Sequence, residues 1–145
     1  MERFVTHTDG GARGNPGPAG SGAVIERMVD GTLELVEEVS EWLGETTNNV
    51  AEYKAVIFAL ESVKRHAVAL PVVVDAYLDS QLIAEQMAGN YRVRNEGLKP
   101  LYNRVRELVT ELGGAVTFEH VPRAQNKHAD RLVNEAIDRA LEQRG

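Results

Sequence analysis

The run Pro71–Leu78 (PVVVDAYL) is the segment that most restricts how this chain of 145 residues can fold. It is short and almost continuously apolar, a pattern typical of a strand that is buried on both faces. Such strands occur in parallel or mixed sheets that helices cover on both sides. The run therefore predicts an α/β protein.

The segments before this run predict three antiparallel strands, at Arg3–Asp9, Ser21–Arg27 and Thr32–Leu43. The stretch Gly10–Gly20 has five glycines and two prolines, so we expect a loop there. The third strand alternates imperfectly, which favours a bulge. Apolar residues at helical spacing and capping residues predict the remaining elements. These are helices over Asn48–Arg65, from Asp79-Ser80 to about Gly89, over Gly97–Leu112 and over Asn126–Gln143, with a last strand at Ala115–His120.

Composition excludes several classes of protein. The length fits one domain, 1–145, and the absence of cysteine excludes disulfides, thiolate metal sites and a cysteine nucleophile. No signal-peptide pattern or membrane-spanning apolar run occurs, so we expect a soluble cytoplasmic protein without a membrane partner. A net charge of −6 argues against indiscriminate coating of DNA.

Four carboxylates stand where surface acids are not expected. Asp9 and Asp79 end predicted strands, at the sheet edge where chemistry gathers in α/β proteins. Glu52 shares a helix face with Val56, Ala59, Leu60 and Val63, and Asp130 borders the apolar face of the last helix. Each acid alone could also be a helix cap or turn residue, and that alternative stays open.

Carboxylates on apolar faces are costly unless they are paired or bind a cation. If the four converge, they repel one another, and divalent cations remove that repulsion. Oxygen ligands without cysteine suit Mg²⁺ or Mn²⁺. Asp75 lies deeper in its strand, and we expect it to be an edge acid or a member of a buried pair. His7 shares the parity of Asp9 and is expected to be a buried, hydrogen-bonded histidine.

Four segments together resemble a known family over nearly the whole chain. They are THTDGGARGNPGPAGSG, TTNNVAEYKAVIFAL, YLDSQLI and HVPRAQNKHADRLVNEA, one around each of the four acids. The chain resembles type 1 ribonuclease H, in a short form without the basic helical insertion and without a preceding hybrid-binding domain. The resemblance implies a ribonuclease H-like fold, with a five-stranded mixed sheet (three antiparallel strands, then two parallel) and helices on both faces.

The resemblance also implies a metal-dependent endoribonuclease that hydrolyses the RNA strand of RNA–DNA hybrids and leaves 5′-phosphate and 3′-hydroxyl ends. Asp9, Glu52, Asp79 and Asp130 would be the catalytic carboxylates that hold two Mg²⁺ or Mn²⁺ ions. His120 matches a mobile histidine of the family, which would move a proton or help the product leave.

Recognition of the hybrid must use the 2′-hydroxyl and the shape of the minor groove. Side chains that both donate and accept hydrogen bonds suit this task, as do small residues that let the backbone approach RNA. Asn15-Pro16 and Asn48-Asn49 could equally form turns or caps. The substrate-binding residues that the resemblance implies are Gly10, Gly11, Ala12, Asn15, Thr47, Asn48, Asn49, Gln81, Arg123 and Asn126.

Two alternatives remain beside a hybrid-specific nuclease. One is a non-catalytic nucleic-acid-binding module of the same fold. The other is a broader nuclease that also acts on double-stranded RNA. No obligate protein partner is evident. Between Ala88 and Arg106 the chain has one acid, Glu96, and five bases that could contact the DNA backbone: Arg92, Arg94, Lys99, Arg104 and Arg106.

Overall fold

The structure, a computed structural model, describes residues 1–144 and is built on one mixed sheet with the order β3-β2-β1-β4-β5. Strands β1 (Arg3–Ala12), β2 (Gly17–Val29) and β3 (Thr32–Thr46) are antiparallel. Strand β4 (Val73–Leu78) runs parallel to β1, and β5 (Ala115–His120) runs parallel to β4. The predicted five-stranded mixed sheet is therefore confirmed.

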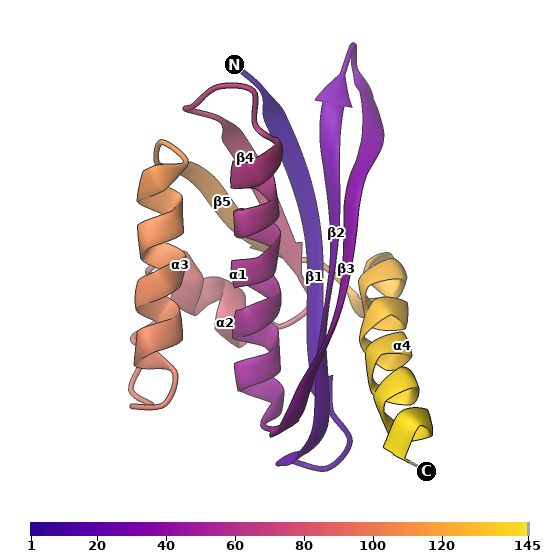
Figure 1. Ribbon diagram of the computed structural model, residues 1–145. Coiled ribbons are helices and arrows are strands. Elements are labelled where there is room, and N and C mark those ends of the chain that lie inside the picture. The colour runs from indigo at the N-terminus through magenta and orange to yellow at the C-terminus, as the bar shows by residue number, and fades with distance from the viewer. Residues whose placement is uncertain (145) are drawn as a thin grey trace.

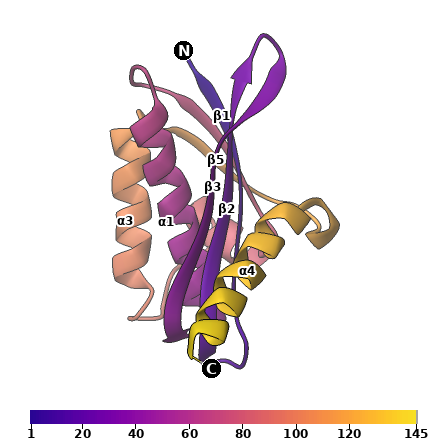
Figure 2. The ribbon, with the colours of Figure 1, turned by 45° about the vertical axis from the view of Figure 1, so that its right-hand side comes forward.

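Helices cover both faces of this sheet. Figure 1 shows α1 (Asn48–His66), α2 (Gln81–Met87) and α3 (Lys99–Glu111) on one side and α4 (Lys127–Arg144) on the other. In Figure 2 α4 crosses the antiparallel half of the sheet, where it contacts β1, β2 and β3. Among residues 1–144 no helix is long and apolar enough to span a membrane. The expected domain end at Gly145 lies outside the described residues.

Apolar burial fixes both helical layers. The main core lies between the sheet and α1, where Phe4 and Ile25 pack against Tyr53 and Leu60, and α3 adds Leu108. The second layer is thinner, because Val24 of β2 packs with Ala129 and Leu132 of α4. The first turns of α1 and α4 are therefore held near the sheet from opposite sides.

The expected loop over Gly10–Gly20 is wrong in its extent, because β1 continues to Ala12 and β2 begins at Gly17. The glycines serve close packing of helices against strands. A Cβ atom on Gly10 would lie 2.2 Å from the carbonyl carbon of Ala51 in α1. A Cβ atom on Gly22 would lie 2.4 Å from the carbonyl oxygen of Ala129 in α4. Only glycine lets both helices approach the sheet this closely.

The expected bulge in β3 is confirmed. The register between β2 and β3 shifts between Ala19 and Gly20, and again between Ile25 and Glu26, so β3 contains an extra residue at each place. Bulges increase local twist and bend the edge strand. This curvature brings β3 into contact with α4 as well as with α1.

Candidate active site

Four elements bring the four carboxylates to one pocket. Asp9 lies near the end of β1, and Asp79 directly follows β4, which runs parallel beside β1. Glu52 lies just after the first turn of α1, and Asp130 lies in the first turn of α4. All four line a pocket of about 410 Å³, together with Gly10, Gly11, Ala12, Asn48, Asn49 and Arg123.

The environment of Asp9 disfavours its charged form. Burial, followed by the charge of Asp79, raises the pKa of Asp9 to about 8. A hydrogen bond with Asp130 and the charges of Asp130 and Glu52 act in the same direction. Asp9 is therefore the carboxylate on which the electrostatic effects of the other three converge.

Glu52 is in a similar position. Burial and the charge of Asp79 raise its pKa to about 7, while a hydrogen bond with Ser80 and the charge of Arg123 lower it in part. Its Oε2 atom is buried and has no hydrogen-bond partner among residues 1–144. An unpartnered buried carboxylate oxygen is costly, and a cation would relieve that cost.

The donor set fits a hard divalent cation. It consists of carboxylate oxygens, which suit Mg²⁺ or Mn²⁺, and it includes the unpartnered oxygen of Glu52. Within residues 1–144, however, no three Asp, Glu or His side chains already stand at the spacing of a metal-binding group.

The turn after β1 is tied to the start of α1. The side-chain oxygen of Asn48 accepts a hydrogen bond from the backbone N–H of Ala12 at 2.7 Å. The backbone N–H of Asn48 donates to Asn15 Oδ1 at 3.1 Å. Thr47 caps α1 by accepting from the N–H of Val50. Thr47 is thus a helix cap, and Asn15 and Asn48 form the turn through their side-chain oxygens, while the contact of all three with substrate stays a prediction. These bonds fix the wall of the pocket that Gly10–Ala12 forms.

The remaining predicted site residues differ in their access to solvent. Asn49, Gln81, Arg123 and His120 are exposed. Asn126 is 1% exposed, and its Nδ2 donates to the carbonyl of Thr8 at 2.8 Å. This side chain holds the start of α4 against β1, and its contact with substrate stays a prediction.

The sequence did not single out three residues at or beside the pocket. Arg13 and Asn134 line it, and Arg13 binds Asn134 Oδ1 at 3.2 Å and Asp138 at 2.7 Å. Ser80 both caps α2 and hydrogen-bonds Glu52. The Asp79-Ser80 pair indicated the cap only, because no sequence spacing links Ser80 to Glu52.

The expectations for neighbouring residues had mixed outcomes. Asp75 pairs with Arg3 at 2.8 Å, so the expected pairing is confirmed, but the hydrogen bond between them is exposed and not buried. His7 is only half-buried, and its ring stacks on Tyr77 with 5.2 Å between ring centroids. No hydrogen bond to its side chain is found among residues 1–144, so that part of the expectation is wrong. Burial lowers the pKa of His7.

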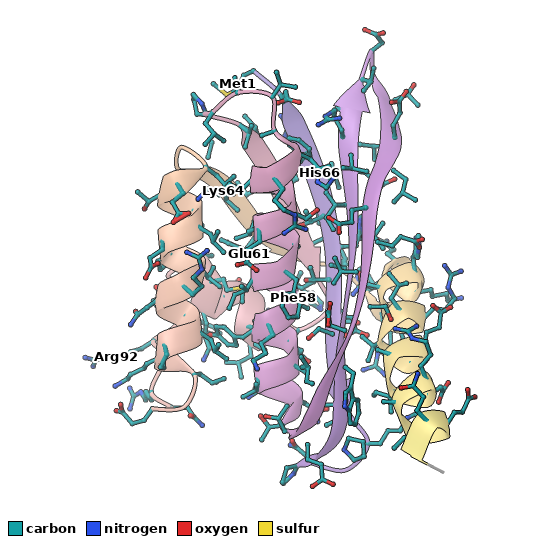
Figure 3. The ribbon with its side chains drawn as sticks, in the orientation of Figure 1. Met1, Phe58, Glu61, Lys64, His66 and Arg92 are labelled. Carbon is teal, nitrogen blue, oxygen red and sulfur yellow. The ribbon has the colours of Figure 1, made fainter. Side chains whose placement is uncertain are left out.

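The predicted group of bases is smaller in the folded chain. Arg104 lies among the carboxylates of Glu61, Glu107 and Glu111, which come from outside the segment in which the bases were counted. Figure 3 labels Glu61 and Lys64 on α1, and Lys64 pairs with Glu111 of α3. This cluster joins α1 to α3, so Arg104 is not free to bind a phosphate.

Comparisons with known proteins agree with this fold. Residues 7–136 match the family model described as reverse transcriptase-like. LC11-RNase H1, isolated from compost, superposes with a TM-score of 0.88 at 46% identity, over 97% of this chain and 99% of that chain. RNase H1 from Halobacterium salinarum gives a TM-score of 0.83 at 39% identity, over 94% and 98% of the two chains. The architecture is thus the ribonuclease H-like fold.

Sequence relatives narrow this class to one family. Ribonuclease H of Acidovorax sp. is 35% identical over 97% of this chain and 99% of its own length. The chain belongs to the ribonuclease H family, and several of its structural neighbours are RNase H1 proteins. "Bifunctional protein Rv2228c" of Mycobacterium tuberculosis is 40% identical over 97% of this chain, and the chain spans only 37% of its length.

Proposed function

We propose that this chain is a divalent-metal-dependent endoribonuclease that hydrolyses the RNA strand of RNA–DNA hybrids. The observation that carries the proposal is the pocket in which Asp9, Glu52, Asp79 and Asp130 meet from four separate elements. The related LC11-RNase H1, 44% identical over 95% of this chain, has been solved in complex with an RNA/DNA hybrid. That relationship supports a hybrid as the substrate of this chain.

The four carboxylates would hold two Mg²⁺ or Mn²⁺ ions. When bound, such ions activate a water molecule and stabilise the leaving oxygen of an in-line displacement. Ser80 holds Glu52 by a hydrogen bond, and Asn126 holds the start of α4, which carries Asp130. Both residues would therefore position the carboxylates.

Hydrolysis adds water to the phosphorus and breaks its bond to the 3′ oxygen, which leaves 5′-phosphate and 3′-hydroxyl ends. His120 pairs with Leu78 in the sheet, so it lies beside the residue that precedes Asp79. It is exposed at the end of β5. We assign it to proton transfer and product departure, which suit an imidazole near neutral pH.

Discrimination of RNA from DNA would use the polar rim of the pocket. Asn49 and Gln81 are exposed amides at the starts of α1 and α2, and both can donate to and accept from a 2′-hydroxyl. The backbone of Gly10–Ala12 offers a wall without bulky side chains. Arg123 faces the carboxylates and can bind a phosphate on that side.

Cleavage of a labelled hybrid with Mg²⁺, with Mn²⁺ and with a chelator tests the proposal. Asp9→Asn should reduce cleavage to background and leave the fold intact. Asp75→Asn is the matched control, because Asp75 is a carboxylate outside the pocket, and it should retain activity. A variant Asp9→Asn that cuts like wild type would refute the assignment. Wild-type protein that binds hybrid but never cuts it would instead be a non-catalytic module.

A further inference from the structure

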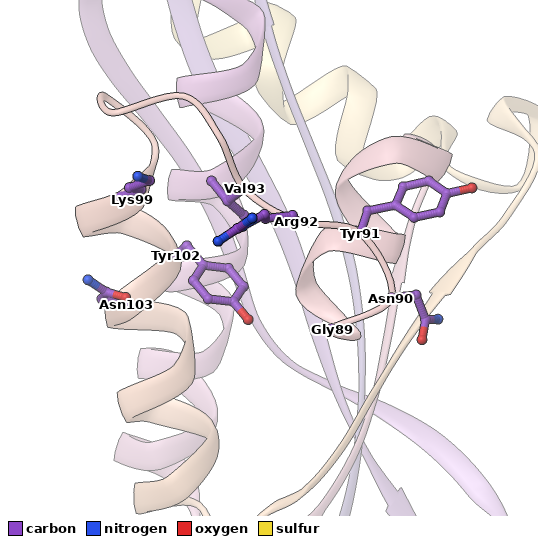
Figure 4. A pocket seen from close by; sticks show the side chains of 8 residues that line it. All are labelled: Gly89, Asn90, Tyr91, Arg92, Val93, Lys99, Tyr102 and Asn103. Carbon is purple, nitrogen blue, oxygen red and sulfur yellow. The ribbon is translucent and has the colours of Figure 1, made fainter.

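A second cavity, of about 540 Å³, lies between α3 and the segment that joins α2 to α3. Figure 4 shows Arg92 beside the ring of Tyr102, with Lys99 and Asn103 on the same helix as Tyr102. Asn90 and Tyr91 complete the rim. None of the four carboxylates lines this cavity.

The wall of the cavity is already formed by the fold. The N–H groups of Asn90 and Tyr91 donate to the carbonyl of Glu85, at 2.9 and 3.2 Å. Val93 packs against the main core, and Tyr102 does so from α3. These contacts hold Arg92 at the mouth of the cavity while Tyr91 remains 49% exposed.

The lining combines positive charge with aromatic rings. Arg92 has no ion pair among residues 1–144, and Lys99 has only an exposed one with Glu96. Although the chain has a net charge of −6, Arg92 and Lys99 together give this cavity a local positive charge that attracts anions. Tyrosine rings offer surfaces on which a nucleobase can stack, and the cavity volume is in the range of sites for small molecules.

We infer that this cavity binds an unpaired nucleotide of a single-stranded extension of the substrate, with its base against a tyrosine ring and its phosphate on Arg92 and Lys99. Bases inside a duplex are stacked on one another, so only unpaired bases can stack on protein rings. The inference deepens the proposed function and rests on it for the identity of the substrate. Asp79 lies just before the N-terminal end of α2, and the cavity lies just beyond its C-terminal end. A helix of seven residues is about 10 Å long. An extension that begins near the cleavage site can therefore reach it.

Binding of short oligonucleotides without divalent metal tests the cavity separately from cleavage. Hexamers of deoxythymidine and of uridine are titrated into isotope-labelled protein, and backbone amide shifts are followed by NMR. We expect saturable shifts within residues 89–103, and whichever oligomer binds more tightly identifies the strand type. Tyr102→Leu and Arg92→Ala should each weaken binding about fivefold or more. Tyr77→Leu and Arg65→Ala are matched controls away from the cavity and should leave binding unchanged.

Cleavage then gives a second measurement. A hybrid with a single-stranded extension should have a lower KM than the blunt hybrid. In Tyr102→Leu the two KM values should be equal. The inference would be overturned if the amide shifts occurred only outside residues 89–103. It would also be overturned if Tyr102→Leu and Arg92→Ala left binding unchanged. A chain that binds the hexamer at this cavity but does not cut any hybrid would refute the proposed function and leave the cavity assignment standing.

Discussion

Asp9 and Glu52 show at the scale of single residues how the site disfavours its own charges. Burial and neighbouring carboxylates raise the pKa of Asp9 from 3.8 to about 8, and that of Glu52 from 4.5 to about 7. At a pH between the ordinary and the raised pKa of each group, the folded chain keeps a proton that the unfolded chain has lost. The stability of the metal-free chain should therefore fall as the pH rises from about 4 to about 8.

Removal of the charge at Asp9 should relieve this cost. With a chelator at pH 8, we expect Asp9→Asn to be about 2 kcal/mol more stable than wild type in urea unfolding. Below about pH 3 the difference should vanish, because the carboxyl at this position is then protonated in both the folded and the unfolded chain. Asp75→Asn breaks the pair with Arg3 and should not stabilise at either pH. Equal stability of Asp9→Asn and wild type at pH 8 would contradict the raised pKa.

At the scale of elements, glycine sets the distance between α1 and the sheet. A Cβ atom on Gly10 would collide with the backbone of Ala51, which directly precedes Glu52, whereas one on Gly11 would meet Val133 Cγ1 at an ordinary 3.8 Å. Gly10→Ala should therefore cost about 3 kcal/mol in unfolding free energy, and Gly11→Ala should cost less than 1 kcal/mol. Urea denaturation of both variants measures the difference, and equal costs would show that α1 can move away freely.

A buried hydrogen bond joins α1 to α2. Tyr53 follows Glu52, and its hydroxyl donates to Gln86 Oε1 at 2.7 Å. Burial raises the pKa of Tyr53 to about 12, so the hydroxyl keeps the proton that it donates. Tyr53→Phe should cost about 1–2 kcal/mol, because Gln86 is left without its partner. In a double-mutant cycle, Gln86→Met in the Tyr53→Phe background should cost less than Gln86→Met alone. Additive costs would indicate that the bond contributes nothing.

Periodicity and position in the sequence predicted most of these elements, together with the meeting of the four acids. Glu52 is predictable because Val56, Ala59 and Leu60 share its helix face, and that face packs on the sheet. The extent of β1 and β2 was missed, because glycine is read locally as a turn residue. Here its function is to accept a helix that is distant in the sequence, at Gly10 and Gly22. The roles of Asn126 and Ser80 were missed for the same reason, since each depends on a contact between distant segments.

At the scale of the whole molecule, charge is distributed unevenly over an acidic chain. Several bases are neutralised by neighbouring acids, such as Arg104 by Glu61, Glu107 and Glu111. Within residues 1–144, no ion pair is found for four arginines near the carboxylate pocket or the second cavity: Arg92, Arg94, Arg106 and Arg123. Nucleic acid should therefore be held by few phosphate contacts.

The salt dependence of hybrid binding measures how many contacts these are. Arg106 already donates to the carbonyl of Met87 at 2.9 Å, which leaves about three guanidinium groups available for phosphates. Each phosphate contact contributes about −0.9 to the slope of log K against log salt, so we expect a slope of about −3. Arg94→Ala should make the slope less negative by about one, whereas Arg104→Ala should leave it unchanged, because Arg104 is already neutralised. Fluorescence anisotropy gives this slope, with Asp9→Asn protein, which should not cut the substrate, and a labelled hybrid that carries a single-stranded extension for Arg92. A flat response would mean that groups other than these arginines hold the duplex.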